Sequence, residues 1–330
     1  MSDSRDGARS TSAANLKVAA ASPSFCEHPA LCEELRRLFP DAKLNATLRP
    51  LDGAELIDFL TGYDVAIVGL ERMSAEVIGA LPDLKIISKL GTGVDMLDAA
   101  AMARRGIRLG WRAGANALSI AELVIGFAII ALRGMAALNQ ALRNGAAPTK
   151  RMGRLVTGRV FGLHGCGHIG QEVVRLLKPF GCTVIAHDTA DRSVFYARYG
   201  VTAVSFDELL RRAEVLSLHI PLSAATSGRP PRAILDRLRP DCVLINTARG
   251  GIVDEDALYA RLSDGRLFAA CSDVFASEPR IDSSLIQLPN FFATPHIGGS
   301  AAEARFAMGR IAIDGIFDTF VPVPGAPPFV

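Results

Sequence analysis

Hydrophobic residues fall into two alternating kinds of segment along the chain. Short apolar runs predict buried strands, and longer segments with apolar positions at helical spacing predict helices that cover them. The predicted strands are Lys17–Ala20, Val65–Val68, Lys85–Ser88, Val160–Leu163, Thr183–Ala186, Val215–Leu218, Val243–Asn246 and Phe268–Ser272. The predicted helices include Ala30–Phe39, Ser74–Ala80, Ser119–Leu142, Ile169–Leu177, Phe206–Arg212, Asp254–Ser263 and Ala302–Phe317. This alternation is typical of an α/β fold with parallel strands.

Composition and charge exclude several classes of protein. The chain has 49% apolar and 21% charged residues, close to the averages for globular enzymes. With 36 basic and 34 acidic side chains, it offers no electrostatic reason to expect binding to nucleic acid or an anionic membrane. The six cysteines form no C-x-x-C pair, so no metal site is predicted. Free thiols indicate a reducing compartment, and we expect a cytoplasmic protein.

The most hydrophobic stretch, Leu118–Leu138, predicts a buried helix rather than a membrane span. It contains Glu122 and Arg133, and only about ten residues between them lack charge, against about 20 needed to cross a bilayer. The predicted helix Ser119–Leu142 is nevertheless too apolar for a single solvent-facing element. We therefore expect part of it to lie in the two-fold interface of a homodimer.

The segment around residue 165 combines a strand, a glycine turn and a helix. The predicted strand Val160–Leu163 leads into Gly165-Cys166-Gly167-His168-Ile169-Gly170, a G-x-G-x-x-G motif, and a helix follows. The first glycine permits a sharp turn, the second lets a pyrophosphate reach N–H groups at the helix start, and the third lets helix and strand approach. The motif alone is a weak signal, but this context favours a dinucleotide site over an ordinary βαβ turn. Its residues would be Gly165, Gly167, His168, Ile169 and Gly170.

Asp188 indicates which dinucleotide is bound. It follows the predicted strand Thr183–Ala186, about 20 residues after the glycine motif, where a carboxylate can bind ribose hydroxyls. A carboxylate repels a 2′-phosphate, so the predicted cofactor is NAD rather than NADP. Arg192 nearby weakens this preference, and a turn or cap role for Asp188 is the alternative.

The position of this motif predicts two domains. The chain has 330 residues, more than the ~100–200 typical of one core, and about half of it precedes the motif with its own βα pattern. We predict a disordered tail at 1–15, a substrate domain of 16–112 and 297–330, and a nucleotide-binding Rossmann domain of 113–296. The fold class is thus two Rossmann-like or flavodoxin-like doubly wound parallel-sheet domains, separated by a cleft.

Three later segments place polar residues just after predicted strand ends. Arg249, Glu278 and His296 follow such ends, where open α/β sheets bind ligands. Reduction of a 2-oxo acid needs a guanidinium to hold the carboxylate, an imidazolium to give a proton, and a carboxylate that favours the charged imidazole. Each residue alone could be structural, but together with a nucleotide motif they favour this chemistry.

The sequence resembles the D-isomer-specific 2-hydroxyacid dehydrogenase family, from about Lys17 to Phe317. The motifs in family order are Gly91-Thr92-Gly93-Val94-Asp95, Asn116-Ala117-Leu118-Ser119-Ile120-Ala121-Glu122, the glycine motif, His219-Ile220-Pro221-Leu222, Asn246-Thr247-Ala248-Arg249-Gly250-Gly251 and Thr294-Pro295-His296. The helix that begins near Asn116 resembles the family's dimer-forming segment. The resemblance therefore implies an NAD-dependent enzyme of two α/β domains.

The family pattern also implies roles for individual residues. Arg249 would bind substrate, His296 would be the acid/base, and Glu278 its partner. The remaining cofactor contacts implied are His219, Pro221, Thr247, Ala248, Arg249, Asp273, His296 and Gly298. The implied substrate contacts are Lys89, Gly91, Thr92, Gly93, Val94, Arg249 and His296.

Several alternatives stay open within this resemblance. The sequence around Gly91–Asp95 most resembles the phosphoglycerate dehydrogenase branch of the family, in a short form without a regulatory domain. This resemblance makes 3-phosphoglycerate one possible substrate. Hydroxypyruvate or glyoxylate reduction is the second, since neither needs a phosphate site. A member of another class would be an NAD-sensing protein like the transcriptional corepressors that share this fold. Those corepressors usually carry long extra tails, whereas this chain has only a short tail at each end, which disfavours the corepressor-like function.

Overall fold

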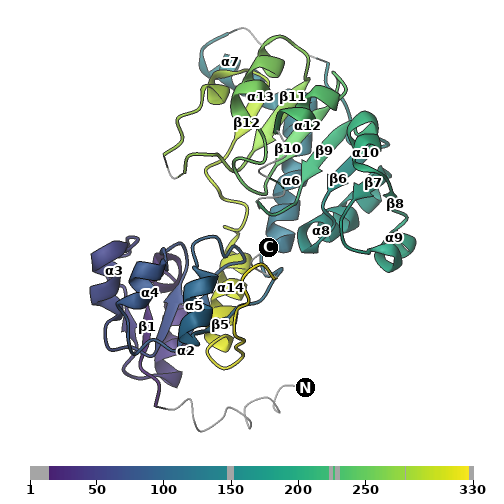
Figure 1. Cartoon of the computed structure of the whole chain (residues 1–330). Helices are drawn as coiled ribbons and strands as arrows, with labels where there is room; N and C mark the ends of the chain where they lie inside the picture. Colours follow the sequence, from purple (N-terminus) through teal and green to yellow (C-terminus); the bar gives the residue numbers. More distant parts are fainter. Residues whose placement is uncertain (1–14, 147–151, 223–225, 227–230, 279, 327–330) are drawn as a thin grey trace. The chain divides into compact units, whose positions relative to one another are not determined.

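The computed structural model describes residues 15–146, 152–222, 226, 231–278 and 280–326. All but Asn15 of the predicted tail, 1–15, lies outside the described residues. The chain divides into two compact units, which we describe separately. The first comprises Met1–Asn116 and Ser300–Val330, and the second Ala117–Gly299. Within each unit, helices lie on both faces of a parallel sheet (Figure 1).

The first unit contains a five-stranded parallel sheet in the order β2-β1-β3-β4-β5. Its strands are β1 (Val18–Ala20), β2 (Lys43–Leu44), β3 (Val65–Val68), β4 (Ile86–Lys89) and β5 (Arg108–Gly110). Its helices are α1 (Pro23–Cys26), α2 (Pro29–Leu38), α3 (Gly53–Leu60), α4 (Ala75–Gly79), α5 (Ala99–Arg105) and α14 (Ala302–Asp314). One face packs on α3, α4 and α5, and the other on α1, α2 and α14.

Helix α14 joins this unit although it comes last in the chain. Met308, Ala312 and Ile313 are buried beneath the sheet, and the Ser88 hydroxyl in β4 donates to the Ala312 carbonyl at 2.5 Å. Gly110 lies so close to Gly315 that a Cβ on Gly110 would meet the Gly315 carbonyl oxygen. The C-terminal segment is therefore part of the core of the first unit.

The second unit contains a seven-stranded parallel sheet in the order β12-β11-β10-β9-β6-β7-β8. Its strands are β6 (Val160–His164), β7 (Thr183–His187), β8 (Thr202–Ala203), β9 (Val215–Leu218), β10 (Val243–Asn246), β11 (Ala269–Ser272) and β12 (Phe291–Ala293). Its helices are α6 (Ala117–Arg133), α7 (Met135–Arg143), α8 (His168–Leu177), α9 (Ser193–Tyr199), α10 (Phe206–Arg212), α12 (Pro231–Arg237) and α13 (Glu255–Ser263), with short 3₁₀ turns η2 (Lys178–Phe180) and η3 (Ser284–Gln287).

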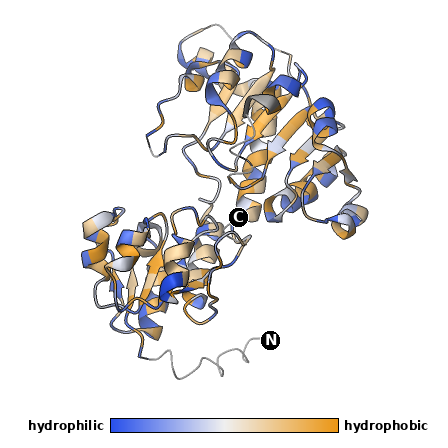
Figure 2. Ribbon diagram, in the orientation of Figure 1, coloured by the Kyte–Doolittle hydropathy of each residue, from blue (hydrophilic) through white to orange (hydrophobic). Residues whose placement is uncertain are grey.

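Two hydrophobic layers hold the second sheet. Helices α6, α8 and α9 pack on one face, and α10, α12 and α13 on the other, which is a doubly wound arrangement. Figure 2 shows the strands of both sheets as the most hydrophobic parts of the molecule. The predicted α/β class, with a doubly wound parallel sheet in each of two units, is confirmed, and every predicted strand lies close to its predicted bounds.

The predicted helix Ser119–Leu142 is wrong as one continuous helix. Gly134 has a left-handed φ of +61° and separates α6 from α7, whose axes are bent by 68°. Glycine adopts this conformation without the steric penalty of a Cβ, so the helical periodicity continues while the axis turns. No single helix in the described part of the chain is long and apolar enough to cross a membrane, and only the bent pair α6 and α7 passes that test jointly.

Candidate active site

The glycine motif has the geometry that a dinucleotide requires. Gly165 has φ +91°, and a Cβ there would stand 2.6 Å from the His219 carbonyl oxygen. A Cβ on Gly170 would stand 2.6 Å from the Gly165 carbonyl oxygen, so this glycine permits close helix–strand packing. A Cβ on Gly167 would meet nothing within 4 Å, which leaves open space at the start of the ten-residue helix α8. The residues present fit a bound pyrophosphate.

Asp188 lies just after β7 and ties that strand end to the glycine motif. Its carboxylate accepts the N–H of Cys166 at 2.6 Å and the N–H of Ala190 at 2.8 Å. Arg192 Nε lies 3.5 Å from the same carboxylate, which offsets part of its charge. Asp188 is thus held at the strand end that precedes α9, by contacts that also fit the alternative role in a turn.

His219 stands beside the glycine motif in an uncharged form. Its Nε2 lies 3.0 Å from the Ser217 hydroxyl, and its Nδ1 is buried with no hydrogen-bond partner among the described residues. Burial, with a smaller contribution from the charge of His164, lowers the pKa of His219 to about 3. The ring therefore adds no positive charge next to the motif. Pro221 follows two residues later and is exposed.

Glu278 and His296 form a direct contact. The His296 Nδ1 lies 2.7 Å from Glu278 Oε2, and Glu278 Oε1 accepts the N–H of Phe275 at 2.8 Å. Because a carboxylate only accepts, Nδ1 carries the proton in this contact and Nε2 faces away from it. The His296 side chain is 47% exposed, so its ring is accessible. This is the arrangement of an oriented acid/base.

Asp273 holds the turn that carries His296. It is 1% exposed, and its carboxylate accepts the Thr294 hydroxyl at 2.5 Å, the N–H of Ile297 at 2.8 Å and the N–H of Gly298 at 2.7 Å. Its carbonyl also accepts the N–H of His296 at 2.8 Å. His296 has a left-handed φ of +55°, which costs energy for a residue with a Cβ. The hydrogen bonds of Asp273 offset that cost and fix the direction of the ring.

The sequence missed this function of Asp273. We expected the residue as a cofactor contact, and its carboxylate also holds the 294–298 turn. The only sequence signal was its place directly after β11, since a carboxylate at a strand end readily accepts N–H groups from the neighbouring strand's turn.

Arg249 lies in the loop after β10, which is shaped by Asn246. The Asn246 side chain accepts the N–H of Ala248 at 3.1 Å and donates to the Arg249 carbonyl at 2.9 Å. Arg249 Nη1 donates to the Ala248 carbonyl at 2.7 Å. Thr247 is 6% exposed, and its hydroxyl has no partner among the described residues.

Gly250 packs this loop against the one that carries Glu278. A Cβ on Gly250 would stand 1.9 Å from the Phe275 carbonyl oxygen, so only glycine permits the approach. Because β10, β11 and β12 are neighbours, Arg249, Glu278 and His296 all follow carboxyl ends at the same edge of the sheet. The structure therefore gathers the three predicted catalytic residues at this edge, with a direct contact between the last two.

The remaining predicted substrate residues lie in the first unit, in the loop after β4. Gly91 has φ +95°, and the Thr92 carbonyl accepts the Trp111 indole N–H at 3.1 Å. Among the residues that the structure describes, no acceptor is recorded for the backbone N–H groups of 91–94. Such N–H groups suit a carboxylate.

Lys89 is buried rather than exposed. It is 2% exposed and donates to the Leu90 carbonyl at 2.5 Å. Glu71, which the sequence analysis did not single out, is equally buried and accepts the N–H of Gly69 at 2.6 Å. Burial raises the pKa of Glu71, and the charge of Lys89 partly opposes that rise. Lys89 and Glu71 are thus buried and close enough to interact electrostatically.

Among the described residues, no group of three or more His, Cys, Asp or Glu side chains is placed to hold a metal ion.

Comparisons with known proteins identify relatives of this chain. The family model described as D-isomer specific 2-hydroxyacid dehydrogenase, NAD binding domain, matches residues 125–298. A hydroxypyruvate reductase of Thermotoga maritima is 34% identical over 86% of this chain and 94% of its own length. A D-3-phosphoglycerate dehydrogenase of Methanocaldococcus jannaschii is 35% identical over 79% of this chain. The chain spans about half of that relative, 51% of its length.

A solved structure gives the same result. The crystal structure of a putative D-isomer specific 2-hydroxyacid dehydrogenase from Polaromonas sp. matches with a TM-score of 0.82 and 30% identity, over 91% of this chain and 95% of the other. The fold and site define an NAD-binding oxidoreductase. The chain belongs to the D-isomer-specific 2-hydroxyacid dehydrogenase family, and the predictions of family, enzyme class and NAD as cofactor are confirmed.

Proposed function

We propose that the protein reduces a small, unphosphorylated 2-oxo acid to the D-2-hydroxy acid with NADH, as a hydroxypyruvate or glyoxylate reductase would. The observation that carries the reaction is the 2.7 Å contact between Glu278 and His296, on a turn fixed by Asp273. The choice of an unphosphorylated substrate is supported by Lys89, the cation expected to meet a phosphate, because it is 2% exposed and donates to the Leu90 carbonyl. The similarity to a hydroxypyruvate reductase over 94% of that relative's length also supports an unphosphorylated substrate.

In the proposed mechanism, Arg249 holds the substrate carboxylate with two hydrogen bonds. Protonated His296 gives its Nε2 proton to the carbonyl oxygen, and Glu278 stabilises the imidazolium and holds the ring in place. The nicotinamide supplies the hydride. The backbone N–H groups of Gly91–Val94 would bind the substrate carboxylate. Reduction needs the imidazolium, so its rate should fall as the pH rises.

The residues proposed to hold the cofactor lie in the second unit. N–H groups of the glycine motif would bind the pyrophosphate, and Asp188 the adenosine ribose. The remaining proposed contacts are His219, Pro221, Thr247, Ala248, Asp273 and Gly298. Because none of the six cysteines forms a disulfide in the described structure, we also propose a cytoplasmic location.

Steady-state turnover with a panel of 2-oxo acids tests the proposal. With NADH, hydroxypyruvate or glyoxylate should give a kcat/KM at least about 10-fold above that of phosphohydroxypyruvate. The reverse order would contradict the substrate assignment and favour phosphoglycerate oxidation. Tight NADH binding without turnover of any substrate would instead favour an NAD-sensing interaction protein.

Cofactor choice gives a second prediction. Wild type should prefer NADH strongly over NADPH, because Asp188 and a 2′-phosphate would be forced together. Asp188→Ala should lower the ratio of kcat/KM for NADH to that for NADPH by about 10-fold or more. Arg192→Ala should raise the same ratio, since it removes the cation beside the carboxylate. Equal efficiency of the two cofactors in wild type would contradict the role of Asp188.

We also propose a homodimer formed through α6 and α7. Most apolar residues of α6 are buried inside the second unit, but Ile129 is 36%, Met135 49% and Leu142 56% exposed. Light scattering at micromolar concentration should therefore give a dimer, and Leu142→Glu should shift it toward monomer. Val194→Glu, on the exposed side of α9, is the matched control and should stay dimeric. A monomeric wild type would contradict this interface.

A further inference from the structure

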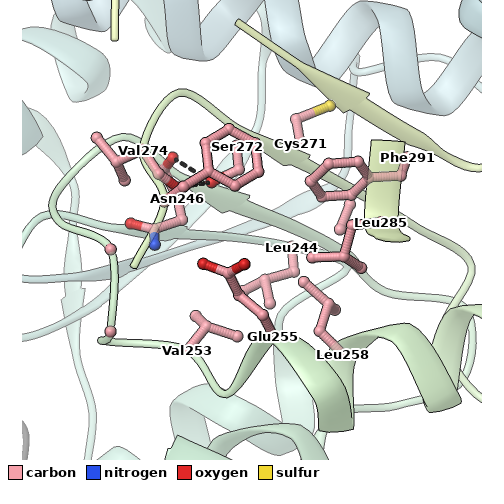
Figure 3. A pocket seen from close by; sticks show the side chains of 14 residues that line it. Leu244, Asn246, Val253, Glu255, Leu258, Cys271, Ser272, Val274, Leu285 and Phe291 are labelled. Atoms are coloured by element: carbon pink, nitrogen blue, oxygen red, sulfur yellow. Dashed lines mark hydrogen bonds between the residues drawn. The ribbon is translucent and has the colours of Figure 1, made fainter. Parts of the chain in front are cut away.

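Glu255 lies outside the proposed catalytic set but contacts the loop that carries Glu278. It is the first residue of α13, after the N-cap Asp254. Its Oε1 accepts the N–H of Ala276 at 2.7 Å, 21 residues further along the chain. Figure 3 shows its carboxylate directed into a small pocket, with Val253 and Leu258 nearby. The Glu255 side chain is half-buried, and its contact with the Ala276 N–H ties the start of α13 to the 274–278 loop.

The contact bears directly on the placement of Glu278. Within four residues, Phe275 N–H binds Glu278 Oε1 and Ala276 N–H binds Glu255 Oε1. The carbonyl of Phe275 meanwhile packs on Gly250, next to Arg249. Glu278 Oε2 is then left to bind His296. The loop is thus held by Glu255 on one side and by the Arg249 loop on the other.

We infer that Glu255 is a positioning residue for the proposed reaction, on which this inference rests. By binding the N–H of Ala276, it keeps the 274–278 loop where the Glu278 carboxylate reaches His296 Nδ1. Loss of this bond would leave the exposed Ala276 N–H to bind water instead, and would remove the tie that holds the loop to α13. His296 would then lose the fixed carboxylate that favours its protonated form.

A simpler role for Glu255 is that of an acidic residue in the first turn of α13, where it interacts favourably with the helix dipole. Asp256 shares this first turn and is exposed. Two variants separate these roles. Glu255→Asp keeps the charge at the helix start but shortens the reach to Ala276, whereas Glu255→Gln removes the charge but keeps an acceptor oxygen at the same reach.

The experiment compares Glu255→Asp, Glu255→Gln and Asp256→Ala with wild type in the full chain. We expect Glu255→Asp to lower kcat for reduction about 10-fold and to move the fall of rate with pH to lower pH, with KM for NADH changed less than about two-fold. Glu255→Gln should retain most of the wild-type rate and profile. Asp256→Ala should overlay wild type. Glu278→Gln removes the carboxylate itself, so its pH–rate profile gives the direction and the largest expected size of the shift in the pH at which the rate falls.

A second readout does not depend on turnover. An NMR titration of the His296 ring follows its protonation in the same variants, and Glu255→Asp should move the midpoint to lower pH. If wild type turns over no 2-oxo acid but this midpoint moves, the positioning role stands and the proposed reaction fails. If wild type is active but both the pH–rate profile and the titration of Glu255→Asp overlay it, the inference is overturned. A lowered melting temperature with unchanged titration also overturns it, since that outcome assigns Glu255 to stability alone.

Discussion

His296→Ala is expected to lower turnover of the 2-oxo acid by ~10²–10⁴-fold while NADH still binds, because the variant loses the group that gives the proton. Stopped-flow or steady-state assays measure the turnover, and quenching of protein fluorescence or calorimetry measures NADH binding. The remaining rate should lose its dependence on pH in the range where the imidazole titrates. A variant that retains more than about a tenth of the wild-type rate would remove His296 from proton transfer.

The backbone of His296 calls for a second variant. Its φ is +55°, a conformation that asparagine adopts more readily than alanine. His296→Asn should therefore keep the turn and its hydrogen bonds to Asp273 while it removes the acid. If His296→Ala were inactive but His296→Asn retained near wild-type turnover, the turn would be needed and the imidazole would not.

Arg249→Ala is expected to raise KM for the oxo acid and to lower kcat together, because the guanidinium both holds the carboxylate and polarises the adjacent carbonyl. Loss of two charge-assisted hydrogen bonds, each contributing about 1.5–3 kcal/mol, should lower kcat/KM by at least about 10²-fold. Substrate assays at saturating NADH give both constants.

Arg249→Lys is the matched variant for this prediction. Lysine keeps the charge but replaces the planar pair of donors with a single ammonium, so it should restore only part of the lost kcat/KM. Full restoration by lysine would mean that Arg249 acts through charge alone. A change in KM for NADH with no change in KM for the oxo acid would mean that Arg249 binds the cofactor rather than the substrate.

Local sequence patterns were sufficient for the nucleotide motif. The strand, the three glycines and the helix are contiguous, so each glycine has a role that follows from its neighbours, and the structure shows each in the expected setting. The edge strands β2, β5 and β8 were not predicted, and β12 was predicted only as the strand end that precedes His296. They are only two or three residues long, which is shorter than the run of at least four residues that marks a strand in a sequence.

The interactions that place the catalytic side chains could not be predicted in the same way. Asp273 binds a turn 21 to 25 residues away, and Glu255 binds the N–H of a residue 21 positions later. No periodicity or motif records such pairs, because they arise only when β10, β11 and β12 lie side by side. The break at Gly134 is similar, since a glycine inside an apolar helical pattern is compatible with a straight helix until packing selects the bend.

The sequence by itself determined the class of fold and the nucleotide motif, and it predicted Arg249, Glu278 and His296 as catalytic residues, because these depend on residue types next to strand ends. The tertiary structure decided how these residues are held: Glu278 against His296, Asp273 beneath the left-handed turn, and Gly250 against Phe275. It also decided that Lys89 is buried near an acidic residue. Distances between segments far apart in the chain are set by packing of the sheet and its helices, which local composition does not encode.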